Sequence, residues 1–153
     1  MSKKFISFAI ILVLLLGLFP CYAFAVDIAE DTDIILLDDG SYIEVMVETS
    51  PARAANTVSG SKKYVCRDSD GDVMWEAKLS ATFAYSGAWY TCATADCDVT
   101  IYESNWYVIS NSTTRSSNNA YAYLTMGRRV LGVTVERPEY TIKLTCDING
   151  NLS

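Results

Sequence analysis

Residues Val73 to Tyr85 read V-M-W-E-A-K-L-S-A-T-F-A-Y, and this stretch decides the fold. All its odd-numbered positions are apolar, and the residues between them include Glu76, Lys78, Ser80 and Thr82. A helix would mix these polar residues into its apolar stripe, whereas a strand places the two sets on opposite faces. The stretch therefore predicts a long strand with one buried face. Because its thirteen residues would extend about 43 Å, we expect the strand to bend and to take part in two sheets.

Six further extended segments follow from alternating polarity and from the turn signals between them. They are predicted at 62–67, 90–102, 106–109, 121–126, 130–136 and 140–146. A bulge is expected at 93–96, a hydrophilic loop at 110–119 and a turn at 127–129. No helical pattern occurs after residue 25. The sequence thus predicts an all-β fold, an antiparallel β-sandwich of about seven strands that is either immunoglobulin-like or a flattened barrel.

Residues 1–25 have the pattern of a secretory signal peptide. Lys3 and Lys4 precede an apolar run at 5–18, and the segment Ala23-Phe24-Ala25 offers a small-x-small cleavage site. The run is shorter than the roughly 20 apolar residues that span a bilayer, so a membrane anchor is the weaker alternative. We therefore expect the signal helix to be cleaved and the protein to be secreted and extracellular, with no membrane contact after cleavage.

Residues 26–59 are predicted to form an acidic leader, and residues 60–153 the main, disulfide-linked domain. The leader contains eight acidic residues and one basic residue, Arg53, and the net charge of the whole chain is −6. The segment Asp38-Asp39-Gly40 lies between two apolar runs, which is typical of a hairpin. Two strands alone are marginally stable, so this hairpin must dock on the main domain or stay mobile. A linker is predicted at 49–61.

The composition argues against several classes of function. The acidic chain lacks the basic footprint that nucleic-acid binding needs. It contains no histidine, which excludes Ser-His-Asp and Cys-His nucleophile systems and most catalytic zinc sites. We expect no cofactor, no metal and no catalytic residue. A glycan hydrolase that uses two carboxylates stays open, with Asp96, Asp98, Glu76 and Glu103 as candidates. The outward strand positions of Glu76 and Asp98 favour ordinary solvated carboxylates.

Cleavage of the signal peptide removes Cys21 and leaves Cys66, Cys92, Cys97 and Cys146. An even number of cysteines in an exported chain predicts two disulfides. A four-cysteine zinc site is less favoured because only Cys92 and Cys97 are close in sequence. The residues themselves leave all three pairings open.

Two segments rich in Asp, Asn and Gly, at 68–72 and 147–151, have the outline of calcium loops. The first does not follow the EF-hand order, because Leu79 stands where a bidentate Glu would be needed. Asp, Asn and Gly also favour tight turns, so hairpin turns are the preferred interpretation of both segments.

Trp89 and Tyr90 are two large aromatic residues beside a break in the strand pattern. They are candidate ligand-stacking residues for a sugar ring. The favoured alternative is that Trp89 plugs the open end of the sandwich. Trp75 and Trp106 are in phase with buried positions, so we expect both in the core.

An ordered set of motifs resembles an uncharacterised family of small secreted β-domain proteins from anaerobic Gram-positive bacteria. The motifs are D-G-S-Y at 39–42, S-G-S-K-K-Y at 59–64, D-G-D-V-M-W at 70–75, T-I-Y-E-S-N-W-Y at 100–107, M-G-R-R-V-L-G-V-T-V at 126–135 and L-T-C-D-I-N-G-N-L-S at 144–153. The resemblance implies a β domain and export, and brings no known activity. It also implies that Cys92 and Cys146 form the basic disulfide and that Cys66 and Cys97 form an added one.

The leading functional hypothesis is a non-catalytic extracellular binding or envelope-associated interaction module. Its partner is unknown, with a glycan or a cell-surface component as the expected class. The alternatives are the carboxylate-based glycan hydrolase and a secreted effector that acts on neighbouring cells.

Overall fold

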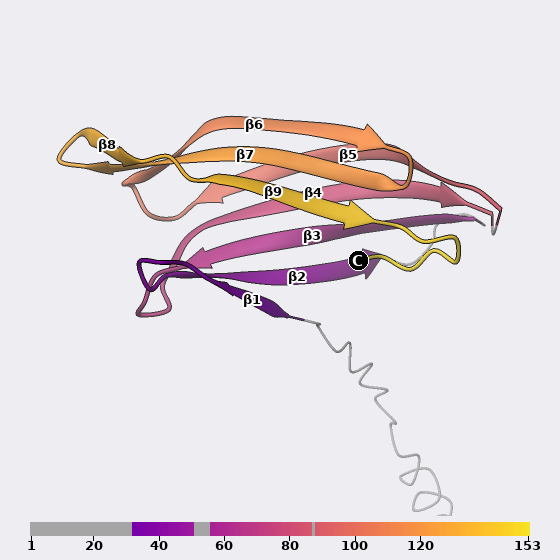
Figure 1. Ribbon diagram of the computed structural model, residues 1–153, viewed down its shortest axis with the longest axis horizontal. Helices are drawn as coiled ribbons and strands as arrows, with labels where there is room; N and C mark the ends of the chain where they lie inside the picture. Colours follow the sequence, from indigo (N-terminus) through magenta and orange to yellow (C-terminus); the bar gives the residue numbers. More distant parts are fainter. Residues whose placement is uncertain (1–31, 51–55, 87) are drawn as a thin grey trace, which may run out of the picture.

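The computed structural model describes residues 32–50, 56–86 and 88–153 as nine strands in two antiparallel sheets (Figure 1). This confirms the predicted all-β sandwich. The signal peptide at 1–25 and the middle of the predicted linker at 51–55 lie outside the described residues. Within the described ranges, no helix has the length and apolar character needed to cross a bilayer.

The first sheet is a five-stranded meander in which each strand pairs with the next. Its strands are β1 (Asp33–Leu36), β2 (Tyr42–Ser50), β3 (Thr57–Arg67), β4 (Val73–Tyr85) and β5 (Tyr90–Ile101). β2 pairs with β3 from Tyr42↔Arg67 to Ser50↔Ser59, so the predicted hairpin belongs to this sheet. The predicted linker is correspondingly shorter than expected, because its first and last residues continue β2 and β3.

The second sheet is built around β7 (Asn119–Val130). β6 (Trp106–Ser116) pairs with one edge of β7, and β9 (Glu139–Thr145) pairs with the other. β8 (Val133–Glu136) pairs only with the last residues of β7, where the two strands form a hairpin that projects beyond the sandwich (Figure 1). The predicted turn at 127–129 is wrong, because the chain reverses at Leu131 and Gly132 instead.

β4 has its predicted bounds, and one of its faces is buried in the core. Trp75, Leu79 and Phe83 are completely buried, whereas Glu76 and Lys78 point to the other face and are partly exposed. Facing them from the second sheet are the buried residues Ala120, Ala122, Leu124, Met126, Ile142 and Leu144. Each buried large apolar side chain contributes about 1.5–3 kcal/mol.

The expectation that β4 would take part in both sheets is wrong. β3 pairs with β4 from Val73 to Ala84, and β5 pairs with it from Trp75 to Tyr85. Because both edges of β4 are paired within the first sheet, no part of the strand is left to pair with the second sheet. The predicted bulge on β5 is confirmed, since Thr82 and Phe83 pair with Thr94 and Cys92 and leave Ala93 as the extra residue.

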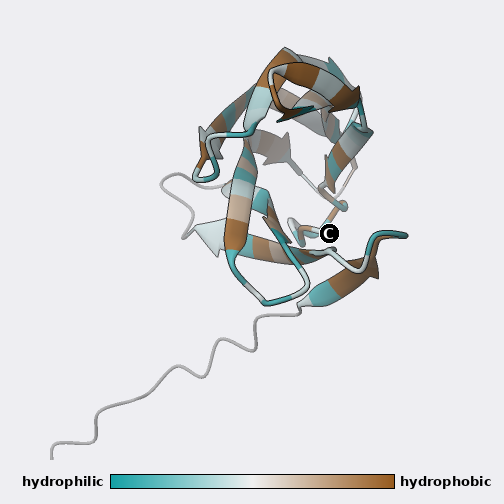
Figure 2. Ribbon diagram, turned by 90° about the vertical axis from the view of Figure 1, so that its left-hand side faces the viewer, coloured by the Kyte–Doolittle hydropathy of each residue, from teal (hydrophilic) through white to brown (hydrophobic). Residues whose placement is uncertain are grey.

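Side chains close one side of the sandwich between β5 and β6. Asn111 Nδ2 donates to the Cys97 carbonyl at 2.7 Å, Thr113 Oγ1 donates to the Ala95 carbonyl at 3.5 Å, and Arg115 donates to the Ala93 carbonyl. These alternating donors explain why the polar segment 110–119, expected to be a loop, continues β6 as a strand as far as Ser116. The polar side chains of this segment donate hydrogen bonds to the edge of the neighbouring sheet, so the segment is a strand and not a solvated loop. Figure 2 views the molecule along its strands and shows the interior enclosed by the two sheets.

Candidate functional site

The best candidate site is an open pocket of about 330 Å³ at the end of the sandwich where β8 projects. We call it the mouth pocket. Segments far apart in sequence meet there: the β1–β2 turn, the start of β6, the end of β8 and the start of β9. The residues that line it are Leu37, Asp38, Asp39, Ser41, Trp106, Glu136, Pro138 and Tyr140.

Aromatic rings form the inner part of this end of the sandwich. The Trp75 ring lies 6.4 Å from the Trp106 ring and 5.1 Å from the Tyr140 ring, centroid to centroid, and both pairs are tilted. Trp75 is completely buried and Trp106 is 6 % exposed, which confirms that both belong to the core. Tilted aromatic pairs at these distances pack favourably, so the rings form a firm floor.

Four buried side-chain atoms in the described part of the chain have no hydrogen-bond partner, and all four gather at this end. Trp106 Nε1 and Trp75 Nε1 belong to the aromatic floor, Arg128 Nε lies on a guanidinium 5.9 Å above the Trp106 ring, and Asn105 Oδ1 belongs to the residue before Trp106. A buried donor left without a partner costs about 1–3 kcal/mol. Of these four residues, only Trp106 lines the mouth pocket.

The rim of the mouth pocket carries mixed charge with an acidic excess. Arg128 Nη1 lies 3.1 Å from Glu136 Oε1 and 3.9 Å from Asp39 Oδ2. Hydrogen bonds from the Ser41 hydroxyl and backbone N–H hold the pKa of Asp39 below its usual value, so Asp39 is an acceptor at neutral pH. Burial, with smaller effects from Cys66, Asp39 and Glu136, raises the pKa of Tyr140, which therefore keeps its proton.

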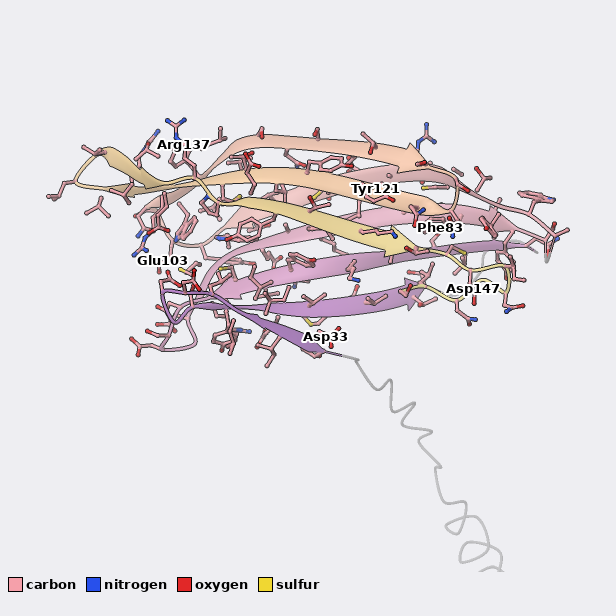
Figure 3. All side chains as sticks on the ribbon, viewed as in Figure 1. Asp33, Phe83, Glu103, Tyr121, Arg137 and Asp147 are labelled. Atoms are coloured by element: carbon pink, nitrogen blue, oxygen red, sulfur yellow. The ribbon has the colours of Figure 1, made fainter. Side chains whose placement is uncertain are left out.

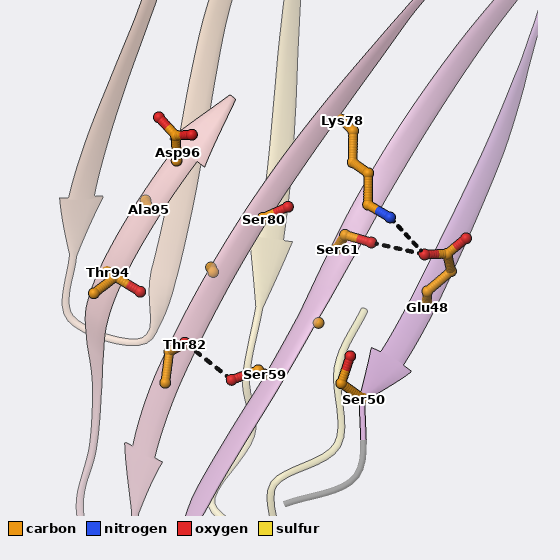
Figure 4. A pocket seen from close by; sticks show the side chains of 12 residues that line it. Glu48, Ser50, Ser59, Ser61, Lys78, Ser80, Thr82, Thr94, Ala95 and Asp96 are labelled. Atoms are coloured by element: carbon orange, nitrogen blue, oxygen red, sulfur yellow. Dashed lines mark hydrogen bonds and ion pairs between the residues drawn. The ribbon is translucent and has the colours of Figure 1, made fainter. Parts of the chain in front are cut away.

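A second site lies on the outer face of the first sheet and has a volume of about 320 Å³ (Figure 4). We call it the hydroxyl trough. Register places two rows of residues side by side across β2, β3, β4 and β5: Glu48, Ser61, Ser80 and Asp96 in one row, and Ser50, Ser59, Thr82 and Thr94 in the next. Small hydroxylated side chains between longer charged ones make the face concave.

The polar groups of the hydroxyl trough largely satisfy one another. Ser59 Oγ and Thr82 Oγ1 are 2.9 Å apart, and Ser61 Oγ donates to Glu48 Oε2 at 3.1 Å. Lys78 Nζ donates to the same Glu48 oxygen at 2.9 Å and lowers the pKa of Glu48, which stays ionised. With no aromatic platform among its lining residues, the trough is the weaker ligand site of the two.

The structure does not bring the four carboxylates predicted for a hydrolase into one site. Glu76 pairs with Lys63 at 2.9 Å on the outer face, as expected of a solvated strand residue. Asp96 lines the hydroxyl trough, and Asp98 is exposed two residues further along β5. Glu103 lies in the β5–β6 turn, at the same end of the molecule as the hairpin (Figure 3). Absence of catalysis stays a prediction.

The four cysteines are buried thiols in the structure, which therefore does not contain the predicted disulfides. Cys66 lies opposite Trp75 on one side of β4, and Cys97 lies opposite Leu79 on the other. This register separates their Cα atoms by about 10 Å across the sheet and about 13 Å along it. A disulfide needs Cα atoms within about 7 Å, so a Cys66–Cys97 bond is incompatible with this fold.

Cys92 and Cys146 lie on neighbouring backbone segments. The N–H of Cys92 donates to the Ser117 carbonyl at 2.7 Å, and that of Cys146 donates to the adjacent Asn118 carbonyl at 3.0 Å. Burial raises the pKa of Cys146, and Asp147 and the nearby Cys92 contribute to the increase. A Cys92–Cys146 bond stays a prediction.

The two segments predicted to be hairpin turns share one geometry. Asp68 Oδ1 accepts hydrogen bonds from the N–H groups of Asp70 and Asp72, and Asp147 Oδ1 accepts them from Asn149 and Asn151. The glycines at 71 and 150 have φ values of 92° and 89°. The turn interpretation is confirmed, because each first aspartate is engaged by its own loop. No cluster of metal-ligating side chains is found among the described residues.

Trp89 and Tyr90 lie at the β4–β5 turn, at the end of the molecule opposite the mouth pocket. Trp89 is 53 % exposed, so the expectation that it plugs the end of the sandwich is wrong. Neither residue lines the mouth pocket or the hydroxyl trough. A ligand-stacking role for Trp89 and Tyr90 stays a prediction.

The mouth pocket was not predicted from the sequence. Its residues are at 37–41, 106 and 136–140, and only the fold brings them together. One signal was available, since Pro138 interrupts the alternating pattern between the strands predicted at 130–136 and 140–146.

Comparisons with family models and with curated proteins found no match. Among solved structures, that of a hypothetical protein from Listeria monocytogenes has a similar chain path, with a TM-score of 0.45 and 12 % identity over 74 % of this chain and 85 % of that one. A likeness at this level carries no functional conclusion. The family resemblance suggested by the motifs stays a prediction.

Proposed function

We propose that the protein is a non-catalytic extracellular binding module whose mouth pocket takes a neutral, hydroxyl-rich ligand such as the end of a glycan. One observation carries the proposal: Trp106, whose indole N–H has no hydrogen-bond partner in the described part of the chain, lines an open pocket together with Tyr140 and the carboxylates of Asp39 and Glu136. Pockets that combine apolar walls with a few convergent polar groups are the usual form of a small-ligand site.

The chemistry of the pocket favours a saccharide over charged ligands. A sugar ring offers an apolar face for Trp106 or Tyr140 and hydroxyl groups that both donate and accept hydrogen bonds. The carboxylates of Asp39 and Glu136 line the pocket and can accept hydrogen bonds from those hydroxyls. An anionic ligand would meet the acidic rim, and a purely cationic one would leave the Trp106 indole N–H without an acceptor.

Asp39 is poorly suited to act as the general acid of a glycan hydrolase. A general acid must keep its proton near neutral pH, which calls for a raised pKa. The pKa of Asp39 is lowered instead, by its hydrogen bonds to Ser41. This supports a role in binding, with the carboxylates as hydrogen-bond acceptors.

The experiment is a calorimetric titration of the exported chain with neutral oligosaccharides, with glucuronate and glucosamine as charged counterparts. We expect the neutral sugars to bind and Trp106→Phe, which keeps a ring but loses the N–H, to weaken binding about fivefold or more. Glu136→Gln serves as a second variant because Glu136 is on the rim and partly exposed.

Ser80→Ala in the hydroxyl trough is the matched control and should bind like the unchanged chain. Binding lost in Ser80→Ala but kept in Trp106→Phe would place the ligand in the trough and contradict the proposal. Binding of glucosamine alone would contradict the proposed ligand class.

A further inference from the structure

The hairpin formed by β7 and β8 ends in an apolar tip that no part of the described chain covers. Val130 pairs with Val133, and between them the chain turns at Leu131 and Gly132, with φ values of 51° and 81°. Leu131 is fully exposed, Val130 is 47 % exposed and Val133 is 64 % exposed. Figure 2, which faces this end of the molecule, shows the apolar colouring of the tip.

Leucine is a poor choice for this turn on stability grounds. Two-residue turns with positive φ at both positions strongly prefer Asn-Gly or Asp-Gly, because a larger side chain strains the left-handed conformation. Leu131 has this strained conformation and is fully exposed, so no packing of its side chain offsets the strain. Residues that break a local rule without compensation within the fold are typical of functional surfaces.

The tip stands on a braced base. The Tyr107 hydroxyl and Thr134 Oγ1 are 2.7 Å apart, and the Arg129 guanidinium lies 4.1 Å from the centre of the Tyr107 ring. Gly127 leaves room for this ring, since a Cβ at that position would come within 2.4 Å of Tyr107 Cζ. The hairpin therefore presents its tip in a defined direction.

The hairpin carries arginines at the base of the tip. The segment 128–137 contains three arginines and one glutamate in a chain whose net charge is −6. Arg128 is paired with Glu136, whereas Arg137 is exposed. The hairpin itself therefore carries a net positive charge, unlike the acidic rim of the mouth pocket behind it, and an apolar tip on a basic hairpin matches a surface that is anionic outside and apolar beneath.

We propose that the hairpin tip inserts into the headgroup region of an anionic lipid bilayer. Four side chains, those of Val130, Leu131, Val133 and Val135, are too few for the roughly 800 Å² per partner of a specific protein interface. Insertion into lipid needs no shape complementarity, so a small apolar tip with nearby arginines suffices for weak, reversible attachment.

The test is co-sedimentation of the exported chain with phosphatidylcholine vesicles, with and without phosphatidylglycerol. We expect stronger binding to the anionic vesicles and a roughly tenfold or greater loss of that binding in Leu131→Asn. Because asparagine suits the turn, this variant should fold at least as stably as the unchanged chain. Ile148→Asn is the matched control, since Ile148 is 43 % exposed in the Asp147 turn at the opposite end.

Equal vesicle binding by Leu131→Asn and the unchanged chain would overturn the proposal, as would no binding to anionic vesicles at all. An oligomer that dissociates in Leu131→Asn, seen by light scattering without vesicles, would also overturn it by assigning the tip to a second copy of the chain. The sugar titration is independent of this result, because Leu131 does not line the mouth pocket.

Discussion

β4 and the β7–β8 hairpin use similar residues in opposite ways. In β4 the large apolar side chains are buried, and the polar residues between them point outward. In the hairpin, valines and a leucine are exposed, and Leu131 has a backbone conformation that disfavours it. Sequence, local preference and packing agree in β4, which marks it as the structural core. They disagree in the hairpin, which marks it as a surface kept for something other than folding.

The largest expected difference between the two regions is in the free energy of unfolding. Phe83→Ala removes a completely buried ring from β4 and should lower stability by about 3–5 kcal/mol. Val133→Ala trims an exposed hairpin residue and should change it by no more than about 0.5 kcal/mol. Urea unfolding of both variants measures the contrast. Similar losses would mean that the hairpin is part of the stable core.

The register of β4 gives the next largest effect. It separates Cys66 from Cys97, so the oxidised protein should contain one disulfide, Cys92–Cys146, and two buried thiols. Under oxidising conditions Cys146→Ser should then cost about 2–4 kcal/mol by losing the cross-link.

Peptide mapping without reduction, with thiol counting in denaturant, tests this pairing. Detection of a Cys66–Cys97 link would contradict the register on both sides of β4. Cys66→Ala serves as a control that removes no cross-link.

The smallest effect is a gain in stability at the hairpin tip. Leu131→Asn should raise the free energy of unfolding by up to about 1 kcal/mol, since asparagine adopts positive φ more readily. Thermal unfolding of the variant measures it. A comparable loss of stability would show that Leu131 has a packing role and would weaken the contrast with β4.

Much of the fold could be predicted because short-range alternation reports burial directly. β4 has its predicted bounds, β5 has its predicted bulge, and β9 is displaced by one residue. The predicted strand at 106–109 ended too early because Asn111, Thr113 and Arg115 resemble loop residues. Their hydrogen-bond partners are on the neighbouring edge of β5, which the sequence does not reveal. The turn at Leu131 was missed because its residue type contradicts its conformation.

The candidate site could not be predicted in the same way. Trp106 was correctly assigned to the core, but the turn at 37–41 and the segment 136–140 reach it only through the packing of both sheets. The expectation of no membrane contact after signal cleavage was based on segments long enough to span a bilayer. The exposed hairpin tip, on which the lipid proposal rests, is visible only in three dimensions.

The most direct test of the binding site follows the indole N–H resonances of the three tryptophans during titration with a neutral oligosaccharide. Trp106 lines the mouth pocket, Trp75 lies beneath it, and Trp89 lies at the opposite end. The proposed function predicts saturable shifts of the Trp106 and Trp75 resonances with Trp89 unchanged. Shifts confined to Trp89 would place binding at the β4–β5 turn and contradict the assignment of the mouth pocket.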